Sequence, residues 1–254
     1  VLTRLPLAAG VAALLLASSA ASSEALPRGD CAAPRPATDL VHCDFQGANL
    51  AGLDLSGVRL DNAKLENANL AGCNLARASA VGSNLKWANL TGSDLRGGDL
   101  SKADLFHASL DRARLDGANL SGANLFGANL NEVHAEGADF SHAYMKDLLM
   151  EEAHLPDSRF ERCFMLRAVL IGSRLMGASM RQVVLTGAAL EQTDFSGADL
   201  TGSLLNGAHL EGAVFHRAGL AETRFTNAVV GGADFTDAVD MPAHLADMLS
   251  KARN

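Results

Sequence analysis

A five-residue repeat constrains this chain more than any other feature. From Leu40 to Phe235, every fifth residue occupies a position that we call the centre, and all of these 40 positions except Ala80 and Ala135 carry Leu, Phe, Met or Val. No insertion or deletion breaks the phase. A helix repeats about every 3.6 residues and a strand about every 2, so this period indicates that each unit forms one side of a coil.

Three other positions of the unit are also restricted. The residue two before the centre is Ala in 23 of the 40 units and Ser, Thr, Cys or Gly in 12 more, which indicates a second, smaller inward-pointing side chain. Gly stands two after the centre in 19 units, where we expect a turn with positive φ. Asn or Asp precedes the centre in 18 units, where a short polar side chain can bond the local backbone.

Units such as Ala48-Asn49-Leu50, Ala88-Asn89-Leu90 and Ala198-Asp199-Leu200 share the pattern A-[DN]-L-x-x. Over residues 38–239 the chain resembles the pentapeptide-repeat proteins. The resemblance implies an all-β fold, a right-handed quadrilateral parallel β-helix (a solenoid) with four units per coil and therefore about ten coils. At about 4.8 Å per coil, the rod would be roughly 48 Å long.

The segments before the repeat predict export. Residues 1–25 contain Arg4, an apolar run from Leu5 to Ala17 and then small residues, as in a secretory signal peptide. The run is too short for a comfortable membrane span, so we expect no span in the mature chain and a periplasmic or extracellular location. Residues 26–37 carry three Pro and read as a linker and N-terminal cap.

Residues 240–254 predict the other end of the array. Asp240 falls on a centre position, where a buried, unpaired carboxylate would be costly, so the repeat should stop there. Apolar residues then follow at helical spacing: Met241, Leu245, Met248 and Leu249. This pattern favours a short helix that caps the last coil, and a dimer contact made by the same helix is the alternative.

The composition argues against nucleic-acid binding and catalysis. The 29 acidic residues are mixed with 21 Lys and Arg, for a net charge of −8, without the basic patch that such binding needs. No motif pairs a nucleophile with a base, so we predict no enzyme and no cofactor.

His134 and His154 lie one coil apart between Arg114 and Arg174. Two imidazoles can share a metal, but a solvated polar ladder is favoured, and we predict no metal site.

The cysteines leave one disulfide open. With 20 residues per coil, Cys43, Cys73 and Cys163 are too far apart to pair with one another. Cys31 lies in the leader and can reach Cys43, and export favours oxidation. A Cys31–Cys43 disulfide and free thiols remain alternatives at this point.

The outward aromatic residues are the strongest departure from a plain repeat. Seven of the 12 aromatic residues are Phe at centre positions. The other five fall on one face in five consecutive coils and, with Leu166, make a candidate partner-binding surface: Trp87, Phe106, Phe126, Tyr144 and Phe164. Such a patch usually marks a contact with a partner or a second copy. Alternatively, residues 26–37 cover it, or the rings only stiffen the rod.

These observations predict a non-enzymatic, exported binding or scaffold rod. Its partner would be a protein or a second copy of the chain, held by the aromatic face or the C-terminal helix. The alternative is a DNA-mimic rod that interacts with DNA gyrase, as quinolone-protection members of the similar family do. One acidic column favours it, while the signal peptide and the interspersed Lys and Arg count against it. That column comprises Asp111, Glu132, Glu151, Glu152, Glu191 and Glu211.

Overall fold

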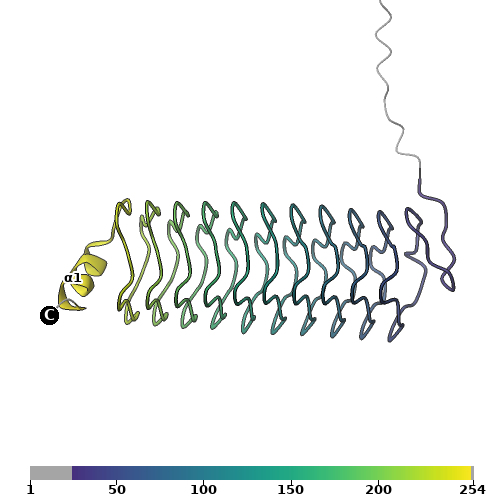
Figure 1. Cartoon of the computed structure of the whole chain (residues 1–254), viewed down its shortest axis with the longest axis horizontal. Coiled ribbons are helices and arrows are strands. Elements are labelled where there is room, and N and C mark those ends of the chain that lie inside the picture. The colour runs from purple at the N-terminus through teal and green to yellow at the C-terminus, as the bar shows by residue number, and fades with distance from the viewer. Residues whose placement is uncertain (1–24, 253–254) are drawn as a thin grey trace, which may run out of the picture.

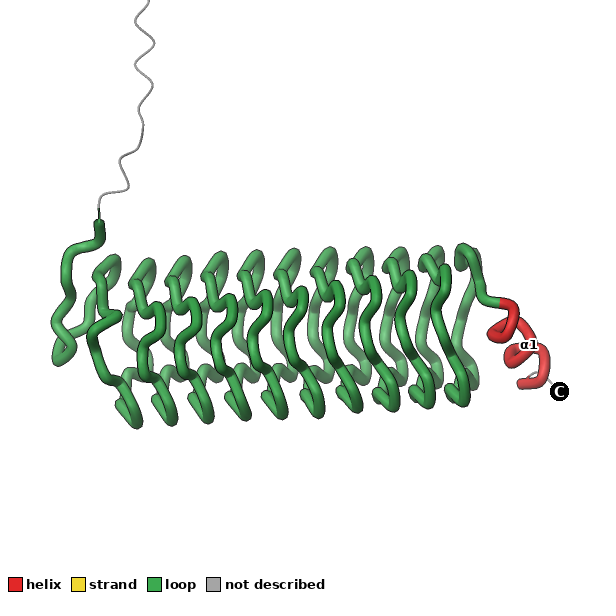
Figure 2. The backbone as a smooth tube through the Cα atoms, turned by 180° about the vertical axis from the view of Figure 1, so that it is seen from behind, coloured by secondary structure: helices red, strands yellow, loops and turns green. Residues whose placement is uncertain are grey.

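A computed structural model describes residues 25–252, which form a straight rod of stacked coils with a single helix at the C-terminal end (Figure 1). The helix is α1, Ala243–Ala252. The β structure consists of isolated parallel bridges and turns, without longer strands in the described part of the chain. Seen from behind, the same coils keep a constant outline along the repeat (Figure 2).

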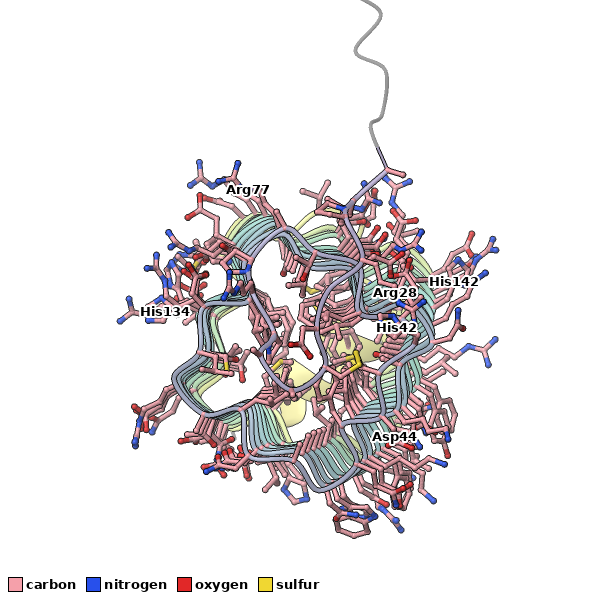
Figure 3. The ribbon with its side chains drawn as sticks, turned by 90° about the vertical axis from the view of Figure 1, so that its right-hand side faces the viewer. Arg28, His42, Asp44, Arg77, His134 and His142 are labelled. Carbon is pink, nitrogen blue, oxygen red and sulfur yellow. A yellow bond between two sulfur atoms is a disulfide. The ribbon has the colours of Figure 1, made fainter. Side chains whose placement is uncertain are left out.

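The register confirms the fold expected from the family resemblance. From Asp39↔Arg59 to Gly219↔Val239, parallel bridges join residues 20 positions apart, so each coil contains four units. The coils superimpose in a four-sided outline when viewed along the rod (Figure 3). The architecture is a right-handed parallel β-helix.

Each unit uses its backbone in the same way. Leu120 N donates to Asp139 O at 2.7 Å in the next coil, and Asn124 N donates to Ala103 O at 2.9 Å in the coil before. Ala123 N closes the corner by donating to Leu120 O at 3.0 Å. From Gly47 to Asp237 the residue two after the centre has positive φ, as Gly122 does at 67°, so the prediction from the glycine pattern is confirmed. Residues with side chains adopt the same conformation at other corners.

The interior is a ladder of centre side chains. Phe140 and Phe160 stack with ring centroids 4.9 Å apart, and both are fully buried. The smaller inward position accepts bulk where coils lie on both sides, since Leu148 is also fully buried. Leu53 is an exception to the inward rule, with 36% exposure. It belongs to the first full coil, and on its face no regular coil stacks on the N-terminal side.

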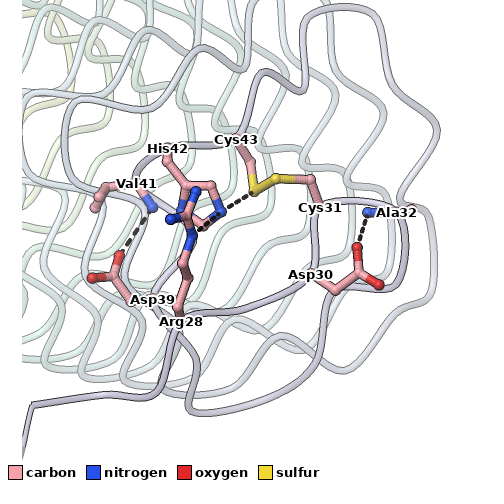
Figure 4. The surroundings of a disulfide bond; sticks show 8 residues. All are labelled: Arg28, Asp30, Cys31, Ala32, Asp39, Val41, His42 and Cys43. Atoms are coloured by element: carbon pink, nitrogen blue, oxygen red, sulfur yellow. Dashed lines mark hydrogen bonds between the residues drawn. A yellow bond between two sulfur atoms is a disulfide. The ribbon is translucent and has the colours of Figure 1, made fainter.

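The leader folds over the N-terminal end of the rod. Gly29 N donates to Asp39 O at 2.9 Å, and Asp39 N donates to Pro27 O at 2.8 Å. Cys31 and Cys43 form a disulfide there, with Cα atoms 5.5 Å apart (Figure 4). Apart from Ala25, the predicted signal peptide lies outside the described residues.

Helix α1 closes the C-terminal end, which confirms the predicted capping helix. Leu245 is fully buried against the last coils, with Met241, Met248 and Leu249 partly buried beside it. His244 Nε2 accepts a hydrogen bond from Phe225 N at 3.0 Å and so satisfies a backbone donor at the end of the ladder. Asp240 is exposed, as expected where the array stops. Within residues 25–252, no helix has the length and apolar character needed to cross a membrane.

Candidate partner-binding surface

The five outward aromatic residues form one continuous stack, which we call the aromatic stripe: Trp87, Phe106, Phe126, Tyr144 and Phe164. The Trp87 and Phe106 rings meet edge to face with centroids 5.5 Å apart. The following pairs are nearly parallel, at 5.3, 6.0 and 5.5 Å along the stripe. The sequence placed these residues on one face, and the structure brings their rings into contact.

The repeat itself sets the path of the stripe. Trp87 lies two after a centre, Phe106 and Phe126 lie one after, and Tyr144 and Phe164 lie one before. The stack therefore crosses its face diagonally while it advances by one coil at each step. Bridges extend the same column with apolar side chains, Phe164↔Val184↔Leu204.

Trp87 occupies a position that disfavours it. Its φ is 57°, in the left-handed region that costs most side chains about 1–2 kcal/mol. The indole lies flat on the imidazole of His107, with centroids 4.4 Å apart and planes 6° apart. This packing helps to offset the backbone cost and holds a large, 52% exposed indole in place.

Sequence reasoning missed His107. Its ring also packs edge-on against Phe106 at 4.4 Å and Phe126 at 5.6 Å, so it joins the first three rings of the stripe. Gly127, one coil on, leaves room for it, because a Cβ atom there would lie 2.5 Å from His107 Cε1. The available signal was its position, 20 residues after Trp87 at the same corner.

Charged groups border the stripe. Lys146 Nζ lies 5.5 Å from the centroid of the Phe126 ring, a cation–π contact. Beside it, Arg167 donates two hydrogen bonds to the Asp147 carboxylate at 2.8 and 2.9 Å. The hydrogen bonds from Arg167 lower the pKa of Asp147, so this border stays ionised at neutral pH.

The stripe is open to solvent in parts. Tyr144 is 42% exposed, while Phe106, Phe126 and Phe164 are half-buried by their neighbours in the stack. Leu166, the remaining predicted contact residue, is also half-buried. The leader contacts the end of the rod rather than this face. Around the next corner, Leu149 is 38% exposed and widens the apolar surface.

His134 and His154 lie on the opposite side of the rod, in a shallow polar groove (Figure 3). Their ring centroids are 5.7 Å apart. Bridges place Arg114 before the pair and Arg174 after it, and Glu132 and Glu152 line the same groove. Charged and polar side chains of both signs therefore surround the two imidazoles.

The acidic column is partly neutralised. Arg112 donates to both oxygens of Glu132, at 2.9 and 3.1 Å, and this hydrogen bonding lowers the pKa of Glu132. Arg112 also lies 3.8 Å from Asp111. Two of the six carboxylates in the column therefore share a positive partner.

Burial and hydrogen bonding also shift pKa values away from these surfaces. Burial raises the pKa of the Cys163 thiol to about 12. Hydrogen bonds from the side chain and the backbone N–H of Thr236, and then from His216, lower the pKa of Asp234 to about 2. The remaining thiol, Cys73, is buried and its pKa is also raised by burial.

Comparison with known proteins identifies the repeat. A model of the family "Pentapeptide repeats" matches eight copies, in the ranges 38–77, 59–97, 83–122, 118–157, 165–202 and 193–237. A comparison with curated protein sequences gives no significant match.

Several solved structures are similar. One is HetL from the cyanobacterium Nostoc sp. strain PCC 7120, a pentapeptide repeat protein involved in heterocyst differentiation regulation. HetL is 27% identical to this chain with a TM-score of 0.52, and the match covers 84% of this chain and 94% of HetL. AT2G44920 from the Arabidopsis thaliana thylakoid lumen is 27% identical with a TM-score of 0.36, covering 50% of this chain and 77% of its own. A trypsin-treated form of QnrB1, a plasmid-mediated fluoroquinolone resistance protein, is 17% identical with a TM-score of 0.36, covering 80% and 94%.

Proposed function

We propose that this chain, which belongs to the pentapeptide-repeat family, is an exported, non-enzymatic rod that binds a protein partner through the aromatic stripe. The observation that carries the proposal is the unbroken stack of five outward rings with exposed Trp87 and Tyr144. Export to the periplasm or the extracellular medium rests on the predicted signal peptide, residues 1–25.

The stripe has the properties of a binding surface. Aromatic side chains supply large apolar area at a low cost in conformational entropy, and they dominate the binding energy of many protein interfaces. Stacking on both neighbours fixes the inner rings before any partner arrives, which lowers the entropy lost on binding. The border of Lys146, Asp147 and Arg167 supplies the polar rim that surrounds an apolar interface core.

The partner should therefore present an elongated apolar surface with charges at its edge. A second copy of this chain is one such surface, and a different protein is the other. Helix α1 is a weaker candidate for the contact, because its apolar residues already pack against the last coils.

A binding role fits the construction of the array better than catalysis does. From Leu40 to Phe235 the repeat contains no inserted loop, and loops are where catalytic groups are usually assembled. The DNA-mimic alternative has less support, because Arg112 neutralises part of the acidic column.

The test replaces two rings of the stripe, the middle ring by Phe126→Ser and the last ring by Phe164→Ser, in one chain. Truncation of an anchoring aromatic residue often costs about 2 kcal/mol or more of binding energy. The double variant should therefore lose self-association in sedimentation velocity, or lose a specific protein in affinity capture from the exported fraction. Fractionation of the producing cells checks the location.

The matched control is the double variant Met176→Ser/Val214→Ser. It removes two half-buried, outward apolar side chains from the opposite face. The control should behave like the wild-type chain. Unchanged sedimentation and unchanged capture in the stripe variant would mean that the rings serve only to stiffen the rod.

A further inference from the structure

Glu191, His209 and Glu211 converge near the C-terminal third of the rod. Glu191 and Glu211 occupy the same outward position in successive coils, 20 residues apart. His209 lies in the same unit as Glu211, on the other side of the centre residue Leu210. One ligand atom of each residue lies within 4.8 Å of the other two. His209 Nδ1 is 3.8 Å from Glu211 Oε1.

The two carboxylates are poorly satisfied by the protein. One oxygen of each, Glu191 Oε2 and Glu211 Oε2, is shielded from solvent and has no hydrogen-bond partner. Such buried oxygens are unfavourable unless something compensates their charge. Among the described residues, no Lys or Arg forms an ion pair with either of them, and His209 is the sole basic group in contact.

The backbone holds these side chains in a fixed relation. Gly172 N donates to Glu191 O at 2.9 Å, and Leu190 N donates to His209 O at 2.8 Å. Gln192 N donates to Glu211 O at 2.9 Å, which ties the two glutamate coils together. Because the ladder fixes all three Cα positions, binding of an ion would require movement of the side chains but not of the backbone.

A cation between these groups would relieve the repulsion between the two like charges. Carboxylate oxygens and a neutral imidazole nitrogen are ligands that Zn²⁺ accepts at about 2.0–2.2 Å. The three ligand atoms lie within 4.8 Å of one another, so binding requires the side chains to rotate toward a common centre. Three protein ligands leave at least one position for water.

The other histidine clusters lack these features. His134 and His154 lie between two arginines, as described above. His42 lies near Cys31 and Cys43, but their sulfur atoms are joined in the disulfide and are not free to coordinate. We propose that Glu191, His209 and Glu211 bind one divalent transition-metal ion of the Zn²⁺ class.

The experiment uses the purified full chain without an affinity tag, stripped with a chelator and titrated with ZnCl₂ by calorimetry. We expect saturable binding of one ion per chain and a rise in melting temperature on addition of Zn²⁺. Parallel titrations with MnCl₂ and CaCl₂ test the metal class, and tighter binding of Ca²⁺ than of Zn²⁺ would overturn it.

Three variants test the ligands: Glu191→Gln, His209→Ala and Glu211→Gln. Loss of an outer-shell partner already weakens metal binding by about 10–100-fold, so loss of a ligand should weaken it by more than about tenfold. Each glutamine variant should melt at or above the metal-free wild-type temperature, because it removes one of two neighbouring like charges. This readout separates loss of the site from loss of the fold.

The matched control is Glu151→Gln/His154→Ala, which removes one carboxylate of the same column and one histidine outside the cluster. It should bind Zn²⁺ as the wild-type chain does. The proposal is overturned if the wild-type chain shows no saturable binding, if the three ligand variants bind normally, or if the control loses binding to the same extent.

Discussion

Gly127→Ala tests whether the rings of the aromatic stripe are held in the order that the structure shows. Gly127 has φ +60°, and an added Cβ would lie 2.5 Å from His107 Cε1 and 2.7 Å from Nδ1. The imidazole would have to move off Trp87 and away from Phe106. Gly117 is a matched control, because it has φ +64° and nothing lies within 4 Å of its added Cβ.

The structure gives the expected magnitudes. Gly117→Ala should cost about 1 kcal/mol of unfolding free energy, the lower end of the penalty for a side chain in the left-handed region. Gly127→Ala should cost the same plus the lost ring contacts, at about 0.5–1.5 kcal/mol for each aromatic pair. With two pairs disturbed, the total is about 2–4 kcal/mol.

The measurement is urea unfolding, followed by circular dichroism and by fluorescence of Trp87, the only tryptophan of the chain. In a His107→Ala background, Gly127→Ala and Gly117→Ala should cost the same, because the obstructing ring is gone. Equal costs of the two glycine variants in the wild-type background would refute the reasoning. So would an excess cost at Gly127 that persists without His107.

Two further predictions concern the thiols and the response to acid. A thiol reagent should find no reactive thiol in the native chain at pH 8, because Cys73 and Cys163 are buried. After denaturation without reductant it should find two thiols, and a count of four would exclude the Cys31–Cys43 disulfide. Asp234 has its pKa lowered to about 2 from 3.8, so it stabilises the fold above about pH 4, and this contribution is lost as pH falls toward 2. The melting temperature of Asp234→Asn should therefore depend less on pH between about 4 and 2, and an unchanged pH dependence would contradict the assignment.

The fold was predicted from two sources: the five-residue period indicated one side of a coil, and the family resemblance supplied the four units per coil. Every centre position must fill the interior with a large apolar side chain, so the period stays evident in spite of isolated exceptions such as Ala80 and Ala135. The C-terminal boundary was equally visible, since Asp240 is incompatible with a centre position. The prediction that the residue two before each centre points into a buried interior was wrong for Leu53. Its burial depends on a neighbouring coil, and at this end of the rod no regular coil covers it.

The candidate site was visible only in part. The shared face of the aromatic residues follows from the 20-residue register, but the diagonal stack and the place of His107 depend on rotamers. Long side chains add a further uncertainty, because a residue such as Arg112 can reach partners within its own coil or in a neighbouring one. For the same reason, spacing alone does not show the convergence of Glu191, His209 and Glu211.

The caps at the two ends limit how copies of this chain can assemble. An uncovered β-helix end would offer unpaired backbone groups to another end, as an edge strand does, and rods would join into filaments. Here His244 takes up a backbone donor at one end, and the disulfide-tied leader lies over the other. These caps disfavour the joining of rods end to end, and they leave lateral contact along the flank, where the aromatic stripe lies, as the geometry that is open to another copy of the chain.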